Sequence, residues 1–173
     1  TTFRITICAV LSLVLLTSTG VAVQRTDSLQ AGKADLKSAG ALTFGPDGVL
    51  FVGDSMGGMI FALDTQDRTP SQATALEVTG LADKIAAMAG TTADQIQVND
   101  VAVNPVSRKT YVSVSRGLGP AAEALIVRID PAGKIEALSL DNIRHARVVL
   151  PNPVNASTGG RGGNQRLQAI TDL

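Results

Sequence analysis

Cysteine and aromatic side chains are scarce in this chain, and tryptophan is absent. Its 173 residues include one cysteine, Cys8, and only 3% aromatic residues. Cys8 falls inside a predicted leader, so the chain that remains after cleavage has no thiol. This excludes disulfides, thiolate metal sites and a cysteine nucleophile there. Export without disulfides is common in the bacterial periplasm, whereas a small eukaryotic secreted domain more often carries several.

An excess of charge of either sign is also missing. Fifteen basic and fifteen acidic side chains cancel. Such a chain has no overall field to hold nucleic acid or an anionic membrane, so we expect neither partner. The 45% of hydrophobic residues is enough for a core, and 17 glycines suit a protein rich in turns.

The N-terminal residues predict a secretory signal peptide over 1–22. Arg4 precedes an apolar run over residues 5–16, and small and polar residues follow up to Ala22. The run is shorter than the roughly 20 residues that span a bilayer. We therefore expect a secreted or periplasmic protein with no stable membrane anchor after the signal is removed.

The rest of the chain is organised around Leu42 to Asp64, which predicts three short strands. Gly45-Pro46-Asp47-Gly48 forms the first turn and Ser55-Met56-Gly57-Gly58 the second. A meander of this kind has one apolar face and two bare edges, so it needs another sheet beside it. Residues 75–78 read as a fourth, outer strand.

This stretch resembles a blade of the NHL, YVTN and gluconolactonase-like β-propellers. The resemblance implies an all-β fold, a partial β-propeller of about two four-stranded blades plus the start of a third. Residues 38–80 form the first blade, after a linker over 23–37, and residues 98–150 the second. Residues 151–167 are a Gly/Pro-rich loop, and 168–173 start the third blade.

A short helix is expected between the two blades. Leu81, Ile85, Met88 and Ala89 share one helical face, and Gly90 ends it. We read residues 81–97 as a helical insertion that covers a blade edge. Because the chain begins with Thr1 and stops inside a predicted strand, we expect it to be a fragment of a longer protein.

Three polar residues are the candidate metal ligands. Asn99 and Asp100 stand at the start of the second blade, and Asp172 at the start of the third. The inner strands of a propeller line its central channel, so these oxygens converge there and suit calcium. The alternative is that they accept backbone hydrogen bonds at strand starts.

The resemblance to the gluconolactonase-like lactonases includes one specific pair of residues. That family carries an Asn-Asp pair at a strand start, which Asn99-Asp100 resembles. It also carries a metal-binding Glu followed by Gly, where this chain has Ala39-Gly40. Alanine cannot bind a metal, and the lactonase ligand set is therefore incomplete.

Other motifs favour structural roles. His145, between Arg144 and Arg147, is either a catalytic base of the kind that the resemblance implies for quinone-dependent propeller dehydrogenases, or part of a charged sheet edge. The glycine-rich residues 159–163 lack the GK[ST] ending of a phosphate loop. Asn155 begins a glycosylation sequon, relevant only in a eukaryotic secretory pathway.

We therefore expect a secreted or periplasmic propeller that binds a protein or small-molecule ligand as a scaffold. The alternative is an enzyme, either a metal-assisted lactonase or hydrolase or a quinone-type dehydrogenase, whose remaining site residues lie in missing blades. Fold alone supports neither, because propellers carry many functions.

Overall fold

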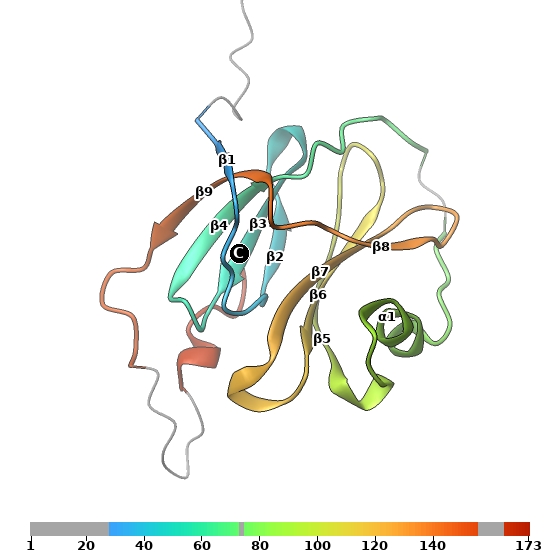
Figure 1. Cartoon of the computed structure of the whole chain (residues 1–173). Coiled ribbons are helices and arrows are strands. Elements are labelled where there is room, and N and C mark those ends of the chain that lie inside the picture. The colour runs from blue at the N-terminus through green and yellow to red at the C-terminus, as the bar shows by residue number, and fades with distance from the viewer. Residues whose placement is uncertain (1–27, 73–74, 156–164) are drawn as a thin grey trace, which may run out of the picture.

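The computed structural model describes residues 28–72, 75–155 and 165–173. Within these ranges the chain is mostly β, with two antiparallel sheets and one α-helix, which confirms the predicted all-β class (Figure 1). The predicted signal peptide lies outside the described residues, as do residues 159–163 and most of the sequon. None of the described helices is long and apolar enough to cross a membrane.

The first sheet has five strands in the order β1-β9-β4-β3-β2. Three of them, β2 (Leu42–Phe44), β3 (Val49–Asp54) and β4 (Met59–Asp64), are the predicted meander. A 3-10 turn over Pro46–Gly48 joins the first two, and Asp47 and Gly48 have φ angles of 61° and 71°. The Asp-Gly pair therefore takes the left-handed conformations that this turn requires.

The other two strands of the first sheet come from distant parts of the chain. β1 (Gln30–Gly32) lies in the predicted linker, and β9 (Ile143–Val149) follows the whole second sheet. β9 pairs with β1 on one side and with β4 on the other (Figure 1). In chain order, the last strand of the first sheet therefore comes after all strands of the second sheet.

The prediction of an outer strand at 75–78 is wrong. Residues 75–78 form no strand, and β9 takes the place beside β4. Leu76 and Val78 instead pack on the apolar cluster of the second sheet. Because the side chains of Leu76 and Val78 cover the second sheet, the backbone of residues 75–78 does not pair with the first sheet.

The second sheet runs in chain order, β5-β6-β7-β8. Its strands are β5 (Ile96–Val103), β6 (Thr110–Arg116), β7 (Glu123–Ile129) and β8 (Ile135–Ala137). Short 3-10 turns over Ala93–Gln95 and Gly119–Ala121 precede β5 and β7. The β5 to β6 register shifts between Val98 and Asp100, which places a β-bulge at Asn99.

The predicted helix is present as α1 (Leu81–Ala89), and it ends at Gly90, whose φ is 67°. Its fully buried Ile85 packs with Val112, Val114, Val127 and Ile129 on one face of the second sheet. The helix therefore covers a sheet face, while the expectation was that it covers an edge.

The opposite face of the second sheet packs on the first sheet and forms the main core. Leu50, Val52, Phe61 and Leu63 of the first sheet are all buried there. The ring of Tyr111 on β6 meets Phe44 edge-on, with centroids 5.0 Å apart and planes at 75°. β2 and β5, the edge strands that begin each meander, lie against each other without forming a ladder.

The last described residues, 165–173, form a 3-10 turn over Gln165–Gln168 and then an extended segment without a strand. Ile170 lies on Gly53 of β3, where an added Cβ would come 2.8 Å from its Cγ2 atom. Gly53 alternates with the core residue Val52, so this contact is on the face of the first sheet that points away from the core. That these residues start a further blade stays a prediction.

Candidate functional site

A cavity of about 810 Å³ opens at one end of the two sheets, where β5 begins and β3 ends. Asn99, Asp100 and Asp172 all line it. The three residues proposed from the sequence as a group thus meet at one cavity, although they come from two distant segments. Its volume falls within the range of small-molecule sites, roughly 300–1,000 Å³.

Small residues make the room for this cavity. Seven of the lining residues are glycine or alanine, three from the segment before β2 and four around the start of β7: Ala39, Gly40, Ala41, Gly117, Gly119, Ala122 and Ala124. Among the described residues, no aromatic side chain lines it. A ligand there would be held by polar groups and not by ring stacking.

The β-bulge directs Asn99 across the gap between the sheets. Its Nδ2 donates to the Ala39 carbonyl oxygen at 2.8 Å and to Ser115 Oγ at 2.9 Å. A bulge inserts a residue that the ladder does not use, so the side chain is free to point at a neighbour. Asn99 therefore links the second sheet to the wall of the cavity.

Asp100 makes the same link through its carboxylate. Oδ2 accepts from the Leu42 amide at 2.7 Å, and Oδ1 accepts from the Val101 amide at 2.7 Å. Nearby, Ser113 Oγ donates to the Gly40 carbonyl oxygen at 2.6 Å. The backbone-accepting role left open by the sequence is thus what Asp100 has, and each of its oxygens keeps a further acceptor position.

Asp172 is exposed and has fewer contacts. Its Oδ1 accepts from the Leu173 amide at 2.8 Å. The segment that carries it is held by Ile170 on Gly53. The contact of Ile170 with Gly53 and the turn before it therefore help to place this carboxylate at the cavity.

Sequence reasoning missed Asp54, which shapes the cavity wall. This fully buried carboxylate accepts from the Lys37 amide through Oδ2, and from the Ser38 amide and hydroxyl through Oδ1, each at 2.9 Å. Oδ1 also accepts from the Gly57 amide at 2.7 Å. The bond to Gly57 could be predicted from the sequence, because an Asp at this position forms an Asx turn. The bonds to residues 37 and 38 could not be predicted, because these residues are distant in sequence.

The donor set fits calcium only in part. The carboxylates of Asp100 and Asp172 and the side-chain amides of Gln97 and Asn99 line the cavity, while calcium takes six to eight oxygens. In the described part of the chain, no cluster of three or more His, Cys, Asp or Glu residues is placed to hold a metal. Water and backbone carbonyls would have to supply most ligands of such an ion.

His145 is not among the residues that line the cavity. It lies half-buried on β9, with its Nδ1 3.0 Å from the Ile143 carbonyl oxygen and its ring 6.1 Å from that of Phe61. Arg144 and Arg147 share the strand. His145 pairs with Gln30 of β1 on one side and with Leu63 of β4 on the other, so the expectation of a sheet-edge residue is wrong. A base acting in the cavity does not fit this position either.

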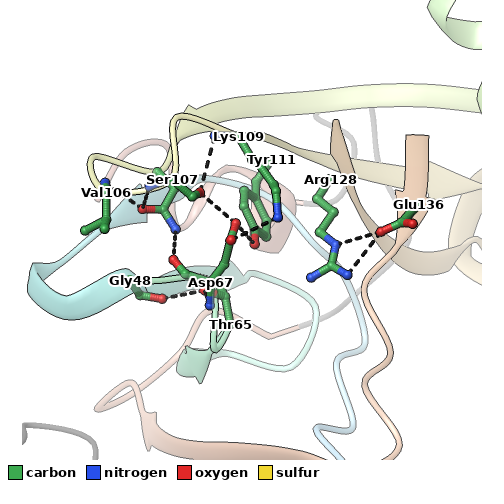
Figure 2. Close-up of polar contacts among 10 residues, drawn as sticks. Gly48, Thr65, Asp67, Val106, Ser107, Lys109, Tyr111, Arg128 and Glu136 are labelled. Carbon is green, nitrogen blue, oxygen red and sulfur yellow. Dashed lines mark hydrogen bonds and ion pairs between the residues drawn. The ribbon is translucent and has the colours of Figure 1, made fainter. Parts of the chain in front are cut away.

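A second polar cluster lies at the opposite end of the two sheets, around Asp67 (Figure 2). The buried carboxylate accepts from Ser107 Oγ at 2.7 Å, and from Lys109 Nζ and Tyr111 Oη at 3.0 Å each. Asn104 Nδ2 donates to the Asp67 carbonyl oxygen at 2.9 Å. This network ties the loop after β4 to the β5–β6 turn.

The titration behaviour of the cluster matches its structural role. Burial acts to raise the pKa of Asp67, but the hydrogen bonds from Ser107, Lys109 and Tyr111 outweigh it, and this pKa lies below its ordinary value. Burial, together with the charge of Asp67, raises the pKa of Tyr111 to about 12. At neutral pH an ionised carboxylate and a neutral phenol therefore form a clamp between the sheets.

Compared with protein-family models, with curated proteins and with solved structures, the chain gives no match. The cavity and its residues are therefore the basis for any functional assignment.

Proposed function

We propose that this chain is part of a secreted or periplasmic β-propeller that binds a small polar ligand as a scaffold. The observation that carries the proposal is that residues from two distant segments, Asn99-Asp100 and Asp172, line one cavity. The cavity lies where the edge strands β2 and β5 begin. In a propeller the innermost strands surround the central channel, and ligands enter there.

The test is a thermal-shift screen of sugars and lactones against the chain and against Ala122→Trp. Ala122 lines the cavity and is half-buried, so a tryptophan there would fill the space. The matched control is Ala121→Trp, at an exposed neighbour that is not in the lining. Compounds that stabilise the wild type and Ala121→Trp but not Ala122→Trp support the proposal. Equal shifts in all three proteins would place binding elsewhere and overturn it.

A metal-assisted hydrolase or lactonase is the second candidate. It is favoured by the presence of two carboxylates and an amide in one cavity. The quinone-type dehydrogenase gains no support, because the lone histidine does not line that cavity.

Calcium titration separates the two candidates. If a cation binds only the folded chain, the melting temperature rises with calcium, by the equivalent of about 2.7 kcal/mol at a hundredfold excess over Kd. We expect this rise to disappear in Asp172→Ala and to persist in Asp141→Ala, which removes an exposed carboxylate outside the cavity. An absence of any shift at millimolar calcium rejects the metal-assisted enzyme and leaves the binding scaffold.

A further inference from the structure

Ser55 carries a hydroxyl that the fold does not use. The residue is 4% exposed, follows Asp54 at the end of β3 and lines the cavity. Its carbonyl oxygen accepts from the Gly58 amide at 3.2 Å and from Arg166 Nε at 3.1 Å, which fixes the backbone. Within the described part of the chain, its Oγ has no hydrogen-bond partner.

That hydroxyl points to a ligand. No fully buried side-chain nitrogen or oxygen of the described residues lacks a partner, so the Ser55 hydroxyl must reach open space. The open space that Ser55 lines is the cavity. Since a nearly buried polar group without a partner is costly, a hydrogen-bonding ligand or water is needed there.

Three other side chains on the wall, Asn99, Asp100 and Asp172, offer acceptors. Two donors of the Asn99 amide group are taken by Ala39 and Ser115, so its Oδ1 is left as an acceptor. Asp172 uses one oxygen for its own neighbour, and each oxygen of Asp100 accepts one backbone amide. Gln97 and Thr171 also line the cavity and can both donate and accept. A ligand that donates hydrogen bonds therefore matches the three acceptor side chains.

The charges on the wall point the same way. Asp100 and Asp172 bring two negative charges to the cavity. The one cation in the described lining, Lys37, has its Nζ 2.7 Å from Asp35 Oδ2, and Asp35 lies outside the lining. An anionic ligand would meet uncompensated like charge, so the cavity selects against it.

We propose that the cavity takes a small hydroxylated amine, with its ammonium group toward the two carboxylates and its hydroxyl groups on Ser55 and Asn99. This rests on the proposed function, since it names the ligand class of the same cavity. It requires no metal, and the absence of aromatic lining predicts weak, millimolar binding.

The experiment compares three probes with one carbon skeleton but different charge: D-glucosamine, D-glucose and D-gluconate. Each is titrated into the full chain in the presence of EDTA, and affinity is measured by calorimetry. We expect glucosamine to bind about fivefold more tightly than glucose, the scale of one exposed charge pair, and gluconate to bind most weakly.

Two variants and one control test whether Asp172 and Ser55 cause the preference for glucosamine. Asp172→Asn should lower the glucosamine-to-glucose ratio while glucose binding persists, because one of the two negative charges is removed. Ser55→Ala should weaken both probes by the same factor. Asp141→Asn, whose carboxylate is outside the cavity, should leave the ratio unchanged.

The outcomes are separable from those of the proposed function. Equal affinities, tighter binding of gluconate, or no binding of any probe at tens of millimolar would overturn the ligand class. The proposed function fails only if no compound in the screen is lost in Ala122→Trp. A preference for glucosamine that is unchanged in Asp172→Asn also overturns the assignment.

Discussion

At the scale of single residues, Asp67 is a buried side chain that joins the two sheets. It accepts three side-chain hydrogen bonds from β6 and the turn before it. Asp67→Asn keeps the shape but loses the charge and one acceptor. We expect unfolding in urea to become easier by about 2–3 kcal/mol, since buried donors lose their partner.

The control for this change is Asp35→Asn. Asp35 also holds a lysine, Lys37 at 2.7 Å, but both side chains are well exposed. Exposed pairs contribute little, so its urea midpoint should match that of the wild type. If the two variants are equally stable, the clamp around Asp67 does not hold the sheets together.

The same carboxylate makes stability depend on pH. Because the pKa of Asp67 is lowered in the folded chain, its contribution is complete above the unfolded pKa of about 3.9 and is lost as the pH falls through the folded value. The melting temperature of the wild type should therefore fall more steeply below about pH 4 than that of Asp67→Asn. Parallel curves for the two proteins over this range would contradict the argument.

At the scale of elements, the contact between β3 and the last described segment controls the cavity. Gly53→Ala would place a Cβ 2.8 Å from Ile170 Cγ2, and a branched side chain cannot easily move aside. We expect residues 169–173 to leave the sheet, which takes Asp172 out of the cavity. Hydrogen exchange of the Ala169 amide, which donates to the Arg166 carbonyl oxygen at 3.1 Å, should become faster while the strands stay protected.

Gly32→Ala is the matched control for this prediction. Gly32 also lies in a strand of the first sheet, but its added Cβ would be 3.7 Å from the ring of His145, an ordinary contact. Exchange in residues 169–173 should not change. Equal exchange in both variants would mean that Ile170 does not anchor the segment.

The elements that the sequence predicts correctly are those with local signals. The turns at 45–48 and 55–58 mark β2, β3 and β4, and the spacing around Ile85 marks α1. The pairing of β9 with β4 has no such signal, because it depends on contacts between distant segments. Apolar and polar residues alternate over 75–78 as they would in a strand. These residues form no strand because Leu76 and Val78 pack on the second sheet.

The candidate site shows the same division. Asn99, Asp100 and Asp172 could be grouped from the sequence because strand starts in neighbouring sheets meet at one end. The roles of Asp54 and Ser55 could not, since the turn that follows them explains both residues by itself. Only the fold shows that both carboxylate oxygens of Asp54 accept hydrogen bonds and that the Ser55 hydroxyl has no partner among the described residues.

At the scale of the whole molecule, the two sheets should unfold together. The second sheet lies in sequence between β4 and β9, which are neighbours in the first sheet, and the main core joins both sheets. Unfolding of either sheet exposes the core of the other. We expect one urea transition, with coincident curves from circular dichroism and from the fluorescence of Tyr111.

Tyr111 is a suitable probe because it is the one tyrosine of the chain and lies fully buried between the sheets. Tyr111→Phe, measured by circular dichroism alone, tests that the probe itself does not create the cooperativity. A fluorescence transition that precedes the circular dichroism transition would show that the sheets separate before they unfold.

The return of β9 to the first sheet also sets the order of events during synthesis. As the chain leaves the ribosome, β1 to β4 appear first, and the outer edge of β4 stays open until α1 and the complete second sheet have emerged. An open edge invites pairing with another nascent chain. A binding factor that shields β4 during translation would therefore raise the yield of native protein more than one that acts after release.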